Sequence, residues 1–191
     1  MPKQALIMID MQRGFLNSAS PLCIPSAEAT VPACVALIDR CHAAGVPVIY
    51  AVRHYRSDGS DVEKPRAAAW AAGGKPLSED CAAHLSDAFP SAFTVLPQDY
   101  VLVKPRFSAF FHTGLDLILR RLGVQTVLLA GTTTPNCIRT TCYDAISLDY
   151  DAVVLSDCTS SVTDAVQAAN LADMQRVAPV PLPFHQAPAS T

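Results

Sequence analysis

Three polar residues stand directly after apolar runs at separate points of the chain, and their types could together form a nucleophile site. Asp10 follows ALIMI, Lys104 follows YVLV, and Cys137 lies in GTTTPNC after TVLLA. In an open parallel sheet, ligands bind beyond the carboxyl ends of the strands, where residues in these positions can meet. A thiol with a proton acceptor beside it can attack a carbonyl carbon. The order of residues therefore predicts a cysteine nucleophile with Asp10 and Lys104 beside it.

The residues around Cys137 predict that it lies at the start of a helix. Thr134 suits the N-cap and Pro135 the first helical position, so Cys137 falls in the first turn of a helix that runs to about Tyr150. The unpaired N–H groups and the dipole at a helix start favour a thiolate. Cys142 belongs to the apolar stripe of the same helix and is expected in the core, with Cys137 as its exposed counterpart.

Each of these residues has a proposed role and an ordinary alternative. Asp10 would take the thiol proton and later give it to the leaving nitrogen, while Lys104 would lower the thiol pKa and hold the carboxylate. Backbone N–H groups of residues 132–137 could bind the oxyanion. Taken singly, however, Asp10 could be a turn residue, Lys104 a solvated strand end and Cys137 a small buried hydrophobe. Only the combination favours catalysis.

The elements that would position these residues alternate along the chain. Apolar runs too short and too continuous for half-exposed strands predict buried parallel strands at residues 5–9, 46–52, 100–103, 126–130 and 152–155. Apolar residues with helical spacing occupy residues 27–44, 113–122, 135–149 and 162–176. This alternation predicts an α/β fold, an open parallel sheet of about six strands with helices on both faces.

A chain of 191 residues, 50% of them hydrophobic, suits one well-buried core, so we expect residues 1–191 to form a single domain. Residues 53–98 interrupt the alternation and show little periodicity apart from helix formers between Arg66 and Ala72. Long excursions of this kind are often binding loops or lids, although a surface insertion is an equal alternative. The Pro-rich tail from Pro179 is expected to be irregular beyond a possible short last strand.

Composition excludes several classes of partner and ligand. The seven cysteines are an odd, scattered set that predicts a reducing compartment, and no spacing typical of a zinc site occurs. The net charge of −3 comes without basic clusters, which argues against nucleic-acid binding and favours a small-molecule partner. No apolar run approaches the roughly 20 residues of a membrane helix, and the first residues show no secretion signal. A cytoplasmic location without membrane contact is expected.

Three segments resemble, in order and spacing, the signature segments of the isochorismatase-like cysteine hydrolases, a family that includes nicotinamidase and N-carbamoylsarcosine amidohydrolase. They read ALIMIDMQRGFL, VLVKPRFSAFFHT and VLLAGTTTPNCIRTTCYDA. The resemblance covers nearly the whole chain and implies a Rossmann-like fold with Asp10, Lys104 and Cys137 as catalytic residues. It implies hydrolysis of small amides, ureido or carbamoyl compounds through a thioester, without a cofactor. It also implies a homodimer or homotetramer.

The same resemblance implies finer features of the site. A non-proline cis peptide is expected between Thr132 and Thr133, with the amides of Thr133 and Cys137 facing the oxyanion. Nicotinamidases add a metal-binding Asp-x-His, but the matching stretch here reads VRHY and leaves only His54, so no metal is expected. Isochorismatases that cleave a vinyl ether lack the cysteine, so amide or ureide hydrolysis is favoured here.

The substrate pocket can be predicted only in outline. Aromatic residues flank the three segments and could close over a planar group, or could be ordinary core residues. They are Phe15, Trp70, Phe107 and Phe111. Arg53 and Arg139 could bind a substrate carboxylate through paired hydrogen bonds, or could lie on the surface or at a subunit interface.

Three other classes of function remain as alternatives. A nucleotide-binding module would need a Gly-rich phosphate loop, and neither GxGxxG nor GxxxxGK[ST] occurs. A redox sensor would use Cys137 as a reactive thiol without hydrolysis. A family member without catalysis would have no need of Asp10 and Lys104. Turnover that depends on all three residues would separate hydrolysis from the other two.

Overall fold

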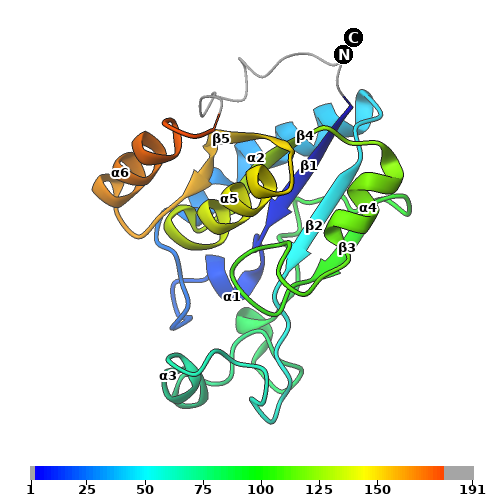
Figure 1. Cartoon of the computed structure of the whole chain (residues 1–191). Coiled ribbons are helices and arrows are strands. Elements are labelled where there is room, and N and C mark those ends of the chain that lie inside the picture. The colour runs from blue at the N-terminus through cyan, green and yellow to red at the C-terminus, as the bar shows by residue number, and fades with distance from the viewer. Residues whose placement is uncertain (1–2, 179–191) are drawn as a thin grey trace.

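The computed structural model describes residues 3–178, in which one parallel sheet has the strand order β3-β2-β1-β4-β5 (Figure 1). The strands are β1 (Gln4–Ile9), β2 (Val48–Val52), β3 (Tyr100–Val103), β4 (Thr126–Thr132) and β5 (Asp151–Ser160). The predicted open parallel sheet is thus confirmed. It has five strands within these residues rather than about six, and the possible last strand from Pro179 lies outside them.

The central strands are continuous apolar runs because both of their faces are covered. Strand β1 pairs with β2 on one side and with β4 on the other, and its residues from Ala5 to Ile9 are almost completely buried. Strand β3 departs from the prediction of a buried strand. Val101 and Val103 are 55% and 54% exposed, because β3 is an edge strand that pairs with β2. Hydrophobicity alone does not distinguish an edge strand from a central one.

Helices cover both faces of the sheet (Figure 1). One face, which carries Leu6 and Met8, packs against α2, and the opposite face, which carries Ile7 and Ile9, packs against α4, α5 and α6. The α-helices are α1 (Arg13–Leu16), α2 (Ala27–Ala43), α3 (Ala67–Ala72), α4 (Leu115–Leu122), α5 (Arg139–Ser147) and α6 (Asp164–Met174). Helix α4 ends at Leu122, the last residue of the helix predicted at 113–122, and the next residue, Gly123, has a φ of 70° that suits glycine.

The excursion at residues 53–98 has a small core of its own. It contains α3 and the 3-10 turn η1 (Ala83–Leu85), and an isolated bridge joins Tyr55 to Ser78. Five buried side chains form its cluster: Phe15, Tyr55, Val62, Trp70 and Leu77. The segment lies beyond the end of the sheet toward which the strands point (Figure 1). It therefore stands at the edge where the candidate site is expected.

Two further predictions bear on the cysteines and on membranes. All seven cysteines are free thiols, and Cys142 is fully buried in the core as predicted. Within residues 3–178, no helix has both the length and the hydropathy needed to cross a bilayer.

Candidate active site

The structure brings Asp10, Lys104 and Cys137 together at the carboxyl ends of the strands. Asp10 follows β1, Lys104 follows β3, and Cys137 lies in the π-helical turn η2 (Thr134–Ile138) after β4. The Lys104 ammonium connects the set, because its Nζ is 2.7 Å from Asp10 Oδ2 and 3.5 Å from Cys137 Sγ. All three side chains are at least 96% buried. The carboxylate thus compensates the buried ammonium, as the prediction required.

Backbone pairing continues past the strand ends and fixes two of these residues. The Asp10 amide donates to the carbonyl of Ala51, and the Lys104 amide donates to the carbonyl of Val52, each at 2.9 Å. Asp10 also has a φ of 54°, a left-handed conformation that aspartate tolerates better than most residues. The carboxylate is therefore held by the sheet itself rather than by a mobile loop.

Gln12 is a buried positioning residue that sequence analysis missed. Its Oε1 accepts from the Arg53 amide at 2.8 Å, and its Nε2 donates to the carbonyls of Arg53 and Asp87 at 2.7 and 2.9 Å. The side chain therefore joins the ends of β1 and β2 to the excursion. A single glutamine a few residues after an apolar run gives no signal that it is fully buried.

The chain around the nucleophile differs locally from the prediction. The Thr132–Thr133 peptide is cis, at the position that the resemblance implies. Thr134, however, is not the N-cap, because it begins η2 and its Oγ1 donates to the carbonyl of Ser160 at 3.0 Å. The helix that follows ends at Ser147 rather than near Tyr150. Single π-helical turns are frequent at functional sites.

Gly131 allows the nucleophile loop to leave the sheet close to β1. Its φ is 110°, and a Cβ at this position would lie 2.0 Å from the carbonyl oxygen of Ile9. Because Ile9 precedes Asp10, this contact sets the separation between the strand that carries the carboxylate and the loop that carries the thiol. A side chain larger than hydrogen cannot be accommodated there without moving the backbone.

The electrostatics of Cys137 overturn the expectation of an exposed, low-pKa thiolate. The side chain is buried, and this burial raises the pKa of the thiol. The negative charge of Asp10 raises the pKa further, whereas the positive charges of Lys104 and Arg53 lower it. Sequence reasoning weighed the helix start and the ammonium but could not see the burial. The thiol is therefore protonated at rest, beside a carboxylate that can accept its proton.

Arg53 is also buried, although its type suggested a surface or pocket position. Its Nη1 donates to the Glu63 carboxylate, to the Tyr55 hydroxyl at 3.3 Å and to the carbonyl of Pro105 at 3.2 Å. The Tyr55 hydroxyl in turn donates to Glu63 Oε2 at 2.7 Å. Glu63 was not identified from the sequence, because an acidic residue in a polar segment is usually solvated.

The remaining predicted pocket residues are divided between the site and other parts of the surface. Phe107 lies beneath two guanidinium groups, those of Arg53 at 5.6 Å and Arg66 at 4.8 Å from its ring centre. Phe15 of α1 and Trp70 of α3 are both buried in the cluster beside the excursion, and Trp70 also lines a hollow next to the nucleophile turn. Arg139 does not point to a free ligand site, since it pairs with Asp173 on α6 at 2.5 Å and donates to Asn170. Phe111 is 48% exposed and lines a separate hollow with Phe110 and His112.

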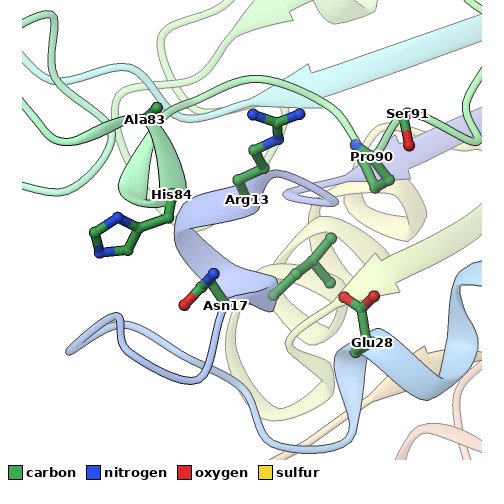
Figure 2. A pocket seen from close by; sticks show the side chains of 8 residues that line it. Arg13, Asn17, Glu28, Ala83, His84, Pro90 and Ser91 are labelled. Carbon is green, nitrogen blue, oxygen red and sulfur yellow. The ribbon is translucent and has the colours of Figure 1, made fainter.

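A hollow of about 410 Å³ lies beside the nucleophile turn. Its walls come from both sides: Thr133 and Asn136 from the turn, and Arg66 and Trp70 from the excursion. Figure 2 shows a different hollow, of about 480 Å³, which lies between α1, η1 and the start of α2 and is lined by Arg13, Glu28 and His84 among others. None of the three predicted catalytic residues lines either hollow, but the first adjoins the turn that carries Cys137, so we place the candidate active site beside the first.

His54, the histidine that matches the metal-binding stretch of nicotinamidases, contacts a carboxylate in this structure. His54 is within hydrogen-bonding distance of Asp87, with Nδ1 and Oδ2 2.8 Å apart. Throughout residues 3–178, no group of three or more His, Cys, Asp or Glu side chains has an arrangement that could hold a metal ion. No chemical step is therefore assigned to a metal held by the described residues.

Comparison with known proteins identifies the family. A family model described as the isochorismatase domain matches residues 4–181. A protein named probable inactive nicotinamidase from Arabidopsis thaliana is 35% identical over 91% of this chain and 88% of its own length. Maleamate amidohydrolase from Pseudomonas putida is 32% identical over 90% of this chain and 79% of its own. An isochorismatase family protein from Desulfovibrio vulgaris has a TM-score of 0.89 and 39% identity, covering 97% of this chain and 96% of that structure.

The fold, the match over almost the whole described chain and these relatives agree. The chain belongs to the isochorismatase family of hydrolases.

Proposed function

We propose that this protein hydrolyses a small amide, ureido or carbamoyl compound through a thioester formed on Cys137, with release of ammonia or an amine. The observation that carries the proposal is the buried contact set of Lys104, whose ammonium touches both the Asp10 carboxylate and the Cys137 sulfur. A structural ion pair would need no thiol beside it. A carboxylate, an ammonium and a thiol in contact are the components of an activated nucleophile.

In the first half of the reaction, Cys137 Sγ forms a bond with the carbonyl carbon while its proton passes to Asp10. Because burial and the carboxylate raise the pKa of the thiol, attack and proton loss are expected to be coupled rather than to begin from a stable thiolate. Lys104 stabilises the negative charge on sulfur as it develops. The amides of Thr133 and Cys137 are the proposed donors to the carbonyl oxygen.

The second half restores the free enzyme. The C–N bond breaks as Asp10 returns the proton to the leaving nitrogen, which departs as ammonia or an amine. Water then adds to the thioester carbon and gives a proton to Asp10. The C–S bond breaks, the sulfur recovers the proton, and the acid product leaves. Whenever Asp10 is charged, Lys104 holds its carboxylate in place, because the two groups form an ion pair.

The named activity of the Pseudomonas putida relative supports an amide as the bond that is cleaved, since maleamate is the monoamide of a dicarboxylic acid. The name of the Arabidopsis thaliana relative, probable inactive nicotinamidase, makes a direct test necessary. The redox-sensor alternative is weakened by the burial of Cys137, because peroxide-sensing thiols are exposed and have a low pKa. Cytoplasmic location and a homodimer or homotetramer remain predictions.

The test is ammonia release from a panel of small amides, ureides and carbamoyl compounds. We expect Cys137→Ala and Asp10→Asn each to lose at least about a thousandfold in kcat for the best substrate. With hydroxylamine present, the wild type should also form the hydroxamate, because the thioester is intercepted. Cys142→Ala is the matched control, since it removes another buried thiol next to the site while leaving the nucleophile in place. Turnover that survives in Cys137→Ala would refute the proposal.

A further inference from the structure

Arg53 has two hydrogen-bond donors in the protein interior that no described residue satisfies. The side chain is fully buried, and its three hydrogen bonds all use Nη1. Within residues 3–178, neither Nε nor Nη2 has a hydrogen-bond partner. Leaving a buried charged donor unpaired is unfavourable, and native structures contain few such groups. The two unpaired atoms therefore suggest a group that binds there.

The guanidinium lies beside the proposed catalytic residues. Arg53 follows β2, the strand between those that carry Asp10 and Lys104. Its Nη1 donates to Pro105, the residue after Lys104. Burial lowers the pKa of Arg53 and the negative charge of Asp10 raises it, while the positive charge of Arg53 lowers the pKa of the Cys137 thiol, so these groups interact electrostatically. The Arg53 side chain therefore lies near the groups proposed for catalysis.

The ion pair with Glu63 uses only one of the three nitrogen atoms of the Arg53 guanidinium. A purely structural pair would be expected to use the two-pronged geometry of guanidinium and carboxylate. Here Glu63 and the Tyr55 hydroxyl occupy only Nη1, while Nε and Nη2 remain. These two atoms form one edge of the planar group, and this edge matches the two oxygens of a carboxylate. Glu63 then holds the guanidinium in orientation and leaves that edge for a ligand.

We infer that Arg53 binds the carboxylate of the substrate, so that the preferred substrates are small amides or carbamoyl compounds with a carboxylate at the far end. This inference rests on the proposed function and adds the substrate class. The Nε and Nη2 edge of Arg53 donates hydrogen bonds to both carboxylate oxygens, and the amide carbonyl of the same molecule reaches Cys137. The ring centre of Phe107 is 5.6 Å from the Cζ atom of the Arg53 guanidinium, so this ring limits the position of the ligand.

The test compares matched substrates that differ in the far group. Monoamides of dicarboxylic acids with two, three and four carbons are each paired with the neutral diamide of the same acid. We expect the wild type to favour the monoamide in kcat/KM by at least about tenfold, because a hydrogen-bonded charge pair discriminates to that degree. Arg53→Gln should abolish this preference and change kcat/KM for the diamide much less. The ratio within one variant does not depend on how much of the enzyme is folded.

Two controls separate the possible failures. Arg120→Gln removes an exposed arginine on α4 and should leave the preference unchanged. Equal losses for monoamide and diamide in Arg53→Gln would show a purely structural role and overturn the inference. If the wild type cleaves neither compound, calorimetry on Cys137→Ala with the same monoamides decides the question. Binding that Arg53→Gln abolishes in that background supports the carboxylate site, whereas binding that persists, or no binding at all, overturns it.

Discussion

The buried ion pair between Asp10 and Lys104 gives a quantitative prediction about stability. Nζ and Oδ2 are 2.7 Å apart, and at an effective dielectric constant of about 20 their attraction is about 6 kcal/mol. Most of this attraction offsets the cost of removing both charges from water. Removal of one partner leaves the other charge buried and uncompensated. We therefore expect Lys104→Met to lower the free energy of unfolding by about 3–5 kcal/mol.

The double variant Asp10→Asn/Lys104→Met provides the decisive comparison. It removes both formal charges, so it should be less destabilised than the sum of the two single variants by at least about 2 kcal/mol. The hydrogen bond from Lys104 to the carbonyl of Arg106 is lost in both variants that lack Lys104, and its loss therefore cancels in the cycle. Urea unfolding followed by far-UV circular dichroism measures all four free energies, and Lys104→Met should unfold at about 1–3 M lower urea.

The exposed pair of Asp116 and Arg120 supplies the matched control. Its side chains are 44% and 54% exposed and lie four residues apart on α4, so the same cycle should give a coupling of about 0.5 kcal/mol or less. If the two pairs showed equal coupling, or if the Asp10 and Lys104 variants were additive within about 0.5 kcal/mol, burial would not control the energetics of the site and the reasoning would be wrong.

Two further predictions concern Gly131 and Cys137. Gly131→Ala should cost at least about 3 kcal/mol in urea unfolding, because its Cβ would meet the Ile9 backbone at 2.0 Å, whereas Gly114→Ala, which meets nothing within 4 Å, should cost less than about 1 kcal/mol. Similar losses of unfolding free energy in the two variants would contradict the close approach of Gly131 to the Ile9 backbone. Iodoacetamide labelling of Cys137, located by mass spectrometry, should still accelerate above pH 9, because burial raises the thiol pKa above its ordinary value of 9.0. Labelling that levels off below pH 9 would show that the pKa is not raised. The raised pKa also means that the protonated thiol stabilises the fold at a pH below the thiol pKa of the unfolded chain. This stabilisation is lost as the pH rises through the thiol pKa of the folded protein.

Some parts of the fold and the site were predictable because local patterns determine them. Asp10 and Lys104 each follow a run of apolar residues, and a parallel sheet places such positions at one edge whatever the details of packing. The end of the helix predicted at 113–122 was right at Leu122, where the apolar spacing stops and Gly123 follows in a left-handed conformation. The identity of the family followed from three short segments around the same strand ends.

Other parts depended on contacts between distant segments. The exposure of β3 follows from its place at the edge of the strand order, which its sequence does not encode. The burial of Cys137, and hence its raised pKa, is a property of the folded surroundings and not of the helix start alone. Gln12 is buried against a partner from another segment, and Glu63 against partners eight and ten residues earlier in the excursion, so no periodic pattern marks either residue.

The separate small core of the excursion has a consequence for how this protein could change during evolution. The reactive groups are attached to the sheet, whereas Arg66 and Trp70, on one wall of the adjoining hollow, belong to a segment with its own apolar cluster. Substitutions that reshape this wall act on a hydrophobic cluster distinct from the two clusters that cover the faces of the sheet. New substrate specificities could therefore arise by substitutions in residues 53–98, or by replacement of that segment, while the catalytic residues on the sheet stay the same.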